Sequence, residues 1–384
     1  MKSFGLAAVV LAIASINVPA VQGQLLLSTN DNKVELVNGV TRVVANPPPD
    51  TLTVFDTRSW PPSVVAELDV PGSVVGPPFS VAVAPDESIA LVTANEKLDP
   101  SDPTKRTANN TMSVVDLKAT PPRIVATLET GRAPAGVSIN RAGTLALVAN
   151  RAEGTLSVFS VKNKQLEAVG KIDLGNPKAL PSSVAFLPDG KTALLTRYGD
   201  NLVNVLYIDG TKVTFDERPL TTGVSPYTLD INRDGTLAAV SNMGRGNGDI
   251  DTVSLIDLTQ KPLRTVETIS VGHSPEGLKF SPDGKFLAVA NIEGSTKSAS
   301  SPFYHDHGTL VVFAVDGNSL RKMAEAPIGR WSQGIAFSKD GRTILVGSMI
   351  DHALDVFRWE GGKLSPGAKL DVGSGPAAIR TAWP

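Results

Sequence analysis

A short apolar strand that ends in a small-small-polar step occurs seven times along this chain, and this repeat constrains the fold most strongly. The seven steps end at Asn30, Asn95, Asn150, Arg197, Asn242, Asn291 and Ser348. They are 65, 55, 47, 45, 49 and 57 residues apart, which is the blade-sized period of a propeller. The surrounding unit reads Gly-x-x-Pro, an apolar strand, Pro-Asp-Gly and a second apolar strand, and its fullest copy is Gly272–Asn291. Because Asp-Gly between apolar runs favours a hairpin turn, we expect an all-β, seven-bladed β-propeller.

The last blade is expected to be split between the two ends of the chain. Gly373-Ser374-Gly375-Pro376 opens a final inner strand over Ala377–Ala382, and no hairpin follows it. The missing second strand is available in Leu25–Thr29, and pairing the two would close the ring and hide both strand edges. The six contiguous blades are expected to have inner strands near Val81–Ala84, Gly136–Ile139, Val184–Leu187, Thr228–Ile231, Leu278–Ser281 and Ile335–Ser338.

The N-terminal segment has the composition of a secretory signal. Residues 1–23 combine Lys2, an apolar stretch over Phe4–Val18 and small residues before Gln24. Residues 24–384 are then expected to form a single domain, in the periplasm or outside the cell. The chain has no cysteine, which excludes disulfides, thiolate metal ligands and a thiol nucleophile. A net charge of -2 gives no indication of nucleic-acid binding, and no segment has the length of a membrane span. We expect a monomer.

The fullest copy of the repeat carries a family resemblance. Gly272–Asn291 resembles the YVTN-type repeat of lactonase-like seven-bladed propellers, and less regular copies cover nearly all of the chain after residue 23. The resemblance implies the propeller fold. Its implications for activity are broad, because similar proteins include sugar-lactone hydrolases, a muconate-cycloisomerising branch, cell-surface proteins and propellers without known activity. Their catalytic residues lie outside the repeat, so the resemblance assigns none here. The recurring Asn itself suits a structural role, since its amide can cap backbone groups at a strand end.

All four histidines are expected on one face of the propeller. That face carries the loops after each small-small-polar step and the Gly-x-x-Pro links, whereas the Asp-Gly turns lie on the opposite face. His305, His307 and His352 fall in adjacent blades, and His273 lies in a link. We therefore expect these four as candidate ligands of one divalent metal, zinc- or copper-like because nitrogen donors dominate. The alternative is that they are ordinary polar loop residues.

The same links predict a cationic ring around the channel mouth. Arg132, His273 and Arg330 follow the link glycine in three blades, and Arg197 replaces the recurring Asn. These residues favour an anionic ligand such as a carboxylate or phosphate, and Tyr198, Tyr227 and Trp331 are candidates for stacking on a ring or sugar. Among the carboxylates of this face, Glu276 and Asp306 are the candidate catalytic groups. The alternative is an ordinary solvated surface.

Two functions of different classes remain open at this point. The first is a binding propeller that holds a small anionic ligand, or another periplasmic protein, in the channel mouth. The second is a metal-assisted lactone hydrolase or related isomerase, with Glu276 or Asp306 transferring the proton. The long segments Glu96–Asn110 and Ile292–His307, expected as surface loops or lids, lie on the same face. The sequence favours binding over catalysis because it contains no recognisable catalytic spacing.

Overall fold

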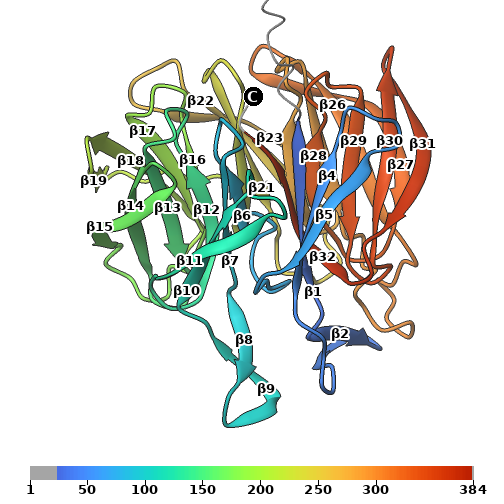
Figure 1. Cartoon of the computed structure of the whole chain (residues 1–384). Coiled ribbons are helices and arrows are strands. Elements are labelled where there is room, and N and C mark those ends of the chain that lie inside the picture. The colour runs from blue at the N-terminus through green and yellow to red at the C-terminus, as the bar shows by residue number, and fades with distance from the viewer. Residues whose placement is uncertain (1–23, 383–384) are drawn as a thin grey trace, which may run out of the picture.

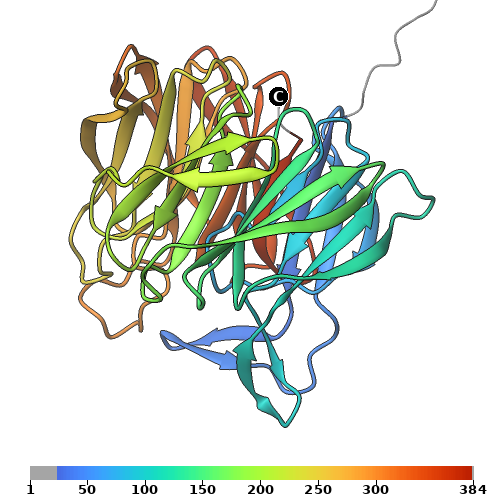
Figure 2. The same ribbon diagram turned by 90° about the vertical axis from the view of Figure 1, so that its left-hand side faces the viewer.

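The computed structural model describes residues 24–382, and the signal-like segment 1–23 lies outside the described residues. These residues form seven four-stranded antiparallel sheets arranged as the blades of a seven-bladed β-propeller (Figures 1 and 2). The blades are described from the inner to the outer strand. Blade 1 contains β32 (Gly375–Thr381), β1 (Leu25–Asp31), β4 (Thr51–Asp56) and β5 (Ser63–Asp69), and blade 2 contains β6 (Val81–Val83), β7 (Ile89–Thr93), β10 (Thr111–Asp116) and β11 (Arg123–Glu129). Blade 3 contains β12 (Pro134–Ile139), β13 (Leu145–Asn150), β14 (Thr155–Lys162) and β15 (Gln165–Asp173).

The remaining four blades follow in chain order without interruption. Blade 4 contains β16 (Pro181–Phe186), β17 (Thr192–Arg197), β18 (Leu202–Asp209) and β19 (Lys212–Phe215). Blade 5 contains β20 (Pro226–Ile231), β21 (Leu237–Asn242), β22 (Asp251–Asp257) and β23 (Arg264–Gly272). Blades 6 and 7 contain β24 (Pro275–Phe280), β25 (Phe286–Asn291), β26 (Gly308–Asp316) and β27 (Ser319–Ile328), then β28 (Ser332–Phe337), β29 (Thr343–Ser348), β30 (Ala353–Glu360) and β31 (Lys363–Asp371). The described residues contain no helix that is long and apolar enough to cross a membrane.

Blade 1 is closed by the two ends of the described chain, as the sequence predicts. β1 pairs antiparallel with β32, from Leu26 opposite Thr381 to Asp31 opposite Gly375. β1 also pairs with β4 on its other side, so both of its edges are hydrogen-bonded. The predicted inner strands of the other six blades are also confirmed, and each observed strand overlaps its expected range.

The core lies between the blades. Alternating apolar residues of each sheet pack against the next sheet, and the clusters run around the ring, for example between β13–β14 and β16–β17. The middle strands are buried on both faces, whereas the outer strands such as β15 alternate between exposed and half-buried residues. Burial of both faces explains why the inner and middle strands read as continuous apolar runs.

Two extra hairpins project from the loop face, which is the face that carries the Gly-x-x-Pro links and is lowest in Figure 1. They are β2 (Val34–Val37) with β3 (Val40–Val43), and β8 (Glu96–Asp99) with β9 (Asp102–Ala108). The second hairpin shows that most of Glu96–Asn110, expected as a surface loop or lid, consists of two paired strands. The first turns at Asn38 and Gly39, both with positive φ, which is the backbone that a two-residue hairpin turn requires.

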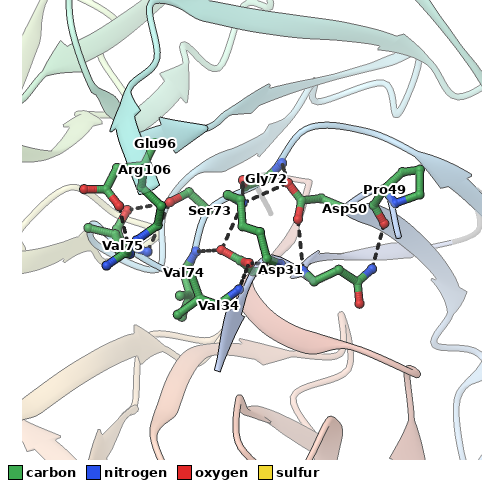
Figure 3. A network of polar contacts seen from close by, with 12 residues as sticks. Asp31, Val34, Pro49, Asp50, Gly72, Ser73, Val74, Val75, Glu96 and Arg106 are labelled. Carbon is green, nitrogen blue, oxygen red and sulfur yellow. Dashed lines mark hydrogen bonds and ion pairs between the residues drawn. The ribbon is translucent and has the colours of Figure 1, made fainter. Parts of the chain in front are cut away.

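A buried ionic network fixes the base of the first hairpin (Figure 3). The Lys33 Nζ lies 3.0 Å from Asp31 Oδ2 and 2.8 Å from Asp50 Oδ2, and it donates to the Gly72 carbonyl at 2.5 Å. Both carboxylates also accept backbone amides, including Val74 N at Asp31 Oδ2. The network therefore ties the strand end of blade 1 to the link that leads to blade 2. Burial raises the pKa of Asp50, and the neighbouring Lys33 opposes that rise.

Replacing Lys33 with Met is expected to lower the free energy of unfolding by about 3–5 kcal/mol at pH 7, because two carboxylates would remain buried without their cation. The loss should be smaller near pH 5. A buried carboxyl with a raised pKa takes up a proton more readily in the folded state, and protonation removes the uncompensated charge. Denaturant unfolding at both pH values measures the effect. Lys322→Met, which removes an exposed ion pair with Glu325, is the control and should cost at most about 1 kcal/mol. An equal loss in both variants would contradict the prediction.

Candidate functional site

The chain enters the inner strands from the loop face through residues with a left-handed backbone. Ala133, Leu180, Ser225, Ser274 and Trp331 have φ angles between 48° and 58°. Their carbonyl oxygens accept the amide of the residue that follows the second strand of the same blade, as Arg151 N donates to Ala133 O at 2.9 Å and Tyr198 N to Leu180 O at 3.2 Å. This pairing places the residue after each strand end beside the start of the inner strand, at the loop-face mouth of the central channel.

The recurring Asn is structural, as the sequence analysis predicts. Asn150 Nδ2 donates to Thr155 Oγ1 and Ser157 Oγ on the third strand of its blade, and Asn242 makes the equivalent pair of bonds in blade 5. Arg197 occupies this position in blade 4, where it contacts Asn204 and forms an ion pair with Asp200. Its guanidinium is therefore held inside its own blade, and not in the predicted cationic ring.

Six side chains at the mouth form what we call the Arg151 cluster: Arg151, Ser182, Tyr198, Tyr227, Glu276 and Gln333. The guanidinium carbon of Arg151 lies 4.7 Å from the Tyr198 ring centroid and 5.5 Å from that of Tyr227. The two rings meet edge to face, with centroids 5.4 Å apart. Arg151 Nη1 donates to Ser182 Oγ. Within the described part of the chain, this guanidinium forms no ion pair with a carboxylate.

Glu276 is the buried acid of the cluster, with 4% of its surface exposed. Burial raises the pKa of Glu276 to about 8, although Gln333 and Arg151 nearby favour its ionised form. Burial also raises the pKa of the Tyr227 hydroxyl, so that residue stays neutral at physiological pH. Near pH 7 the cluster thus combines one cation with a largely protonated carboxyl group.

Buried polar atoms without a well-formed hydrogen bond within the protein are concentrated on the innermost strands. Among the described residues, seven of the twelve such atoms lie on these strands or next to them: Ser80 Oγ, Ser183 Oγ, Glu276 Oε2, Ser332 Oγ, both amide atoms of Gln333 and Arg380 Nη1. The other five belong to Gln24, Glu96, Arg106, His273 and Asn291. Since a buried polar atom without a partner is destabilising, such atoms usually contact water or a ligand. Their position identifies the channel as the polar interior of the molecule.

Arg132, Arg330 and His273, which the sequence predicts as parts of one cationic ring, lie in three separate links, and each faces an acidic residue of the adjoining loop. The backbone amides of Arg132, His273 and Arg330 donate to Glu153, Glu293 and Asp351, respectively. Arg330 also forms a side-chain ion pair with Asp351 at 3.0 Å. Burial acts to raise the pKa of Glu153, but Lys171 and, after it, the exposed Arg132 hold that pKa below its usual range. These acids locally offset the predicted cationic field.

The histidines are similarly dispersed. His305, Asp306 and His307 are exposed on the Ile292–His307 loop, where His307 Nδ1 lies 2.6 Å from Asp306 Oδ1. His352 is exposed and His273 is buried, with no hydrogen-bond partner at Nε2. The described residues contain no group of three or more His, Cys, Asp or Glu side chains placed to hold a metal ion. The predicted four-histidine site therefore gains no geometric support.

Three residues that the sequence predicted as site residues come together in the Arg151 cluster, and the other three members of that cluster were not predicted. Tyr198, Tyr227 and Glu276 belong to the Arg151 cluster, whereas Trp331 packs beside the apolar cluster at the base of the first hairpin. Arg151, Ser182 and Gln333 escaped sequence analysis. Arg151 follows a recurring Asn directly, and Ser182 and Gln333 follow the first residue of their inner strands. Comparing these two positions across the blades would have found them.

Comparisons with known proteins support the fold. No family model and no curated protein sequence matches the chain. Among solved structures, a Bacteroides fragilis protein provisionally named a 6-phosphogluconolactonase has a TM-score of 0.71 at 16% identity, covering 95% of this chain and 99% of its own. The periplasmic gluconolactonase of Pseudomonas aeruginosa has a TM-score of 0.67 at 20% identity, covering 94% and 99%. Hydrazine synthase of Kuenenia stuttgartiensis has a TM-score of 0.61 at 19% identity, covering 81% and 91%. At these identities the likeness shows the fold alone.

Proposed function

We propose that the loop-face mouth binds a small organic anion, with Arg151 holding its carboxylate or phosphate. The observation that carries this proposal is a guanidinium fixed by two tyrosine rings and Ser182 but without a carboxylate partner. Arginine is always charged in proteins and offers several donors in one plane, which suits a carboxylate or phosphate. A guanidinium that is oriented before binding loses little conformational entropy when the ligand arrives.

The rest of the cluster suits a hydroxylated ligand. The protonated carboxyl of Glu276 can donate or accept a hydrogen bond, and the Gln333 amide supplies both kinds of group. Tyr198 presents an aromatic surface that is partly accessible, against which a sugar or ring can pack. A sugar acid, or another small hydroxy acid, fits this combination of one cation, neutral polar groups and aromatic carbon.

Replacing Arg151 with Met is expected to weaken binding of the best ligand about 10- to 100-fold, because a hydrogen-bonded charge is lost. Titration calorimetry with gluconate, 6-phosphogluconate, succinate and inorganic phosphate measures the affinities. Arg132→Met removes an exposed arginine of the same face and should leave them unchanged. If none of the four binds wild-type protein, or if Arg151→Met binds equally well while melting normally, the mouth is not the predicted anion site.

A second candidate function is hydrolysis of a sugar-acid lactone. The observation that favours it is Glu276, a buried carboxyl with a pKa near 8 beside the proposed anion site, in a fold shared with a gluconolactonase. Ionised Glu276 would take a proton from water as its oxygen attacks the lactone carbonyl. The same proton would then pass to the ring oxygen as the carbon–oxygen bond breaks. Arg151 would orient the substrate. This route uses residues of the cluster and does not require the predicted histidine site.

Export from the cytoplasm is also part of the proposal. It rests on the signal-like composition of residues 1–23, and the structural likeness to a periplasmic protein agrees with it. We further propose that residues 24–384 act as a single domain. Mass spectrometry of protein from the periplasmic fraction would identify the mature N-terminus, which we expect at Gln24.

A further inference from the structure

A second group of charged side chains lies deeper in the channel, at one position of the inner strands. Asp230 on β20, Lys279 on β24 and Arg380 on β32 occupy the same register, four residues after the first proline of the strand. The other blades carry Ala82, Ser138, Ala185 and Ala336 at this register. Arg380 Nη1 lies 4.0 Å from Asp230 Oδ1, although their strands belong to blades 1 and 5. The Arg380 side chain therefore reaches across the channel.

The Asp230 carboxylate is already bound by other groups. Its Oδ1 accepts Lys279 Nζ at 2.9 Å, and its Oδ2 accepts the Phe280 amide at 2.9 Å. The 4.0 Å separation from Arg380 is beyond hydrogen-bonding distance. The two cations Lys279 and Arg380 thus share the single Asp230 carboxylate, with Arg380 at the outer limit of an ion pair. Only 8% of Arg380 is exposed, and its Nη1 has no hydrogen-bond partner.

One face of the Arg380 guanidinium is covered by an aromatic ring. Its central carbon lies 3.9 Å from the ring centroid of Phe79, which lies just before the inner strand of blade 2. This contact orients the guanidinium plane but supplies no negative charge. A guanidinium does not release its proton in proteins, so the buried charge needs a counter-charge or a strong acceptor. Small side chains at four of the seven blades limit the steric obstruction around it.

We propose that Arg380 is the centre of an anion-binding site inside the channel, selective for a small monoanion such as a halide or formate. A small ion is favoured because the acceptor must reach a buried guanidinium that is enclosed by Phe79 and Asp230. The alanine and serine side chains at this level of the channel leave room for such an ion. The nearby Asp230 carboxylate disfavours a dianion. This site is separate from the Arg151 cluster, and it does not rest on the proposed function.

Bromide soaking of wild-type crystals tests the site directly. Anomalous scattering from protein soaked in about 0.5 M sodium bromide should give a peak within hydrogen-bonding distance of the Arg380 guanidinium. The same peak is expected in Arg151→Met crystals, which distinguishes this site from the mouth. The proposal is overturned if wild-type crystals show no bromide peak beside Arg380. It is also overturned if a peak is present there and formate does not displace it.

Thermal unfolding provides a second test in solution at constant ionic strength. Bromide or formate should raise the melting temperature of wild-type protein relative to sulfate, the disfavoured dianion, by about 2 °C for each tenfold increase above the dissociation constant. Arg380→Met should remove this dependence, and Arg132→Met should keep it. Stabilisation by formate alone assigns the site to carboxylates, and stabilisation by both anions assigns it to small monoanions generally. If Arg380→Met responds as wild type does, the proposal is wrong; if the variant does not fold, the bromide soak decides.

Discussion

A chain truncated before Ala377 is expected to lose the cooperatively folded propeller and to aggregate. The truncation removes most of β32, whose residues Ala377, Ala378 and Ile379 are at most 1% exposed. It also leaves the inner edge of β1 unpaired beside the channel, and β32 no longer separates the inner strands of blades 2 and 7. An open apolar strand edge pairs readily with other chains. Size-exclusion chromatography and thermal unfolding, followed by circular dichroism, measure the effect.

A matched control removes a net six residues, against eight in the truncation, from a part that does not close the ring. Replacing Glu35–Arg42 with Asn-Gly keeps Val34 and Val43 paired and joins them by a favourable two-residue turn. All seven blades and the buried Lys33 network remain intact in this variant. We expect it to be soluble and to melt within a few degrees of wild type. A truncated protein that is soluble and melts like this control would show that the terminal strands do not close the ring.

The affinity for an anionic ligand is expected to fall as the pH rises through about 8, and Glu276→Gln should abolish this dependence. Burial raises the pKa of Glu276 to about 8, so the carboxyl is protonated and uncharged at lower pH. Above that pH its negative charge would lie beside Arg151 and oppose a bound anion. A tenfold or greater loss of affinity between pH 7 and pH 9 is expected for gluconate, measured by calorimetry.

The same residue distinguishes binding from catalysis because the two functions have opposite pH dependences. If Glu276 is a general base in lactone hydrolysis, kcat/KM should rise through about pH 8. Glu276→Gln should then lower that rate about 100-fold or more. The increase of the enzymatic rate with pH must be measured relative to the rate of spontaneous lactone hydrolysis at each pH. If wild-type protein hydrolyses the lactone no faster than Glu276→Gln does, or no faster than buffer alone, hydrolysis through Glu276 is not the function. A pH-independent affinity would exclude Glu276 from the anion site.

Stability provides an independent check on the protonation of Glu276. Because its folded pKa lies above the ordinary value of 4.5, the folded state retains a proton that the unfolded state releases between these two pH values. Stability should therefore decline as the pH rises from about 4.5 to about 8, by a few kcal/mol at most. Glu276→Gln should lack this decline. Equal slopes for the two proteins would show that the carboxyl is not perturbed.

The sequence by itself determined the architecture of this protein. The seven small-small-polar steps, the Asp-Gly turns and the incomplete repeat at each end predicted seven blades and their closure, because strand length and turn chemistry are local properties. Val37-Asn38-Gly39-Val40 also encoded a hairpin that sequence analysis overlooked. In blade 2, Val81 pairs with Val92, whereas in blade 3 the corresponding pair is Val137 with Val148, so Ala94, and not Asn95, takes the position of Asn150. The spacing of the small-small-polar steps along the sequence cannot by itself reveal such a one-residue offset.

Only the tertiary structure decided which side chains meet around the axis. Sequence analysis selected Arg132, Arg197 and Arg330 and left out Arg151, but acidic residues of the adjacent loops or of the same blade lie beside those three. Arg151 instead reaches two tyrosines and a serine contributed by blades 4 and 5. Asp230 and Arg380 likewise approach each other across the channel although they are 150 residues apart. Local periodicity fixes where each strand begins, whereas closure of the ring determines which charges become neighbours and which of them are removed from water.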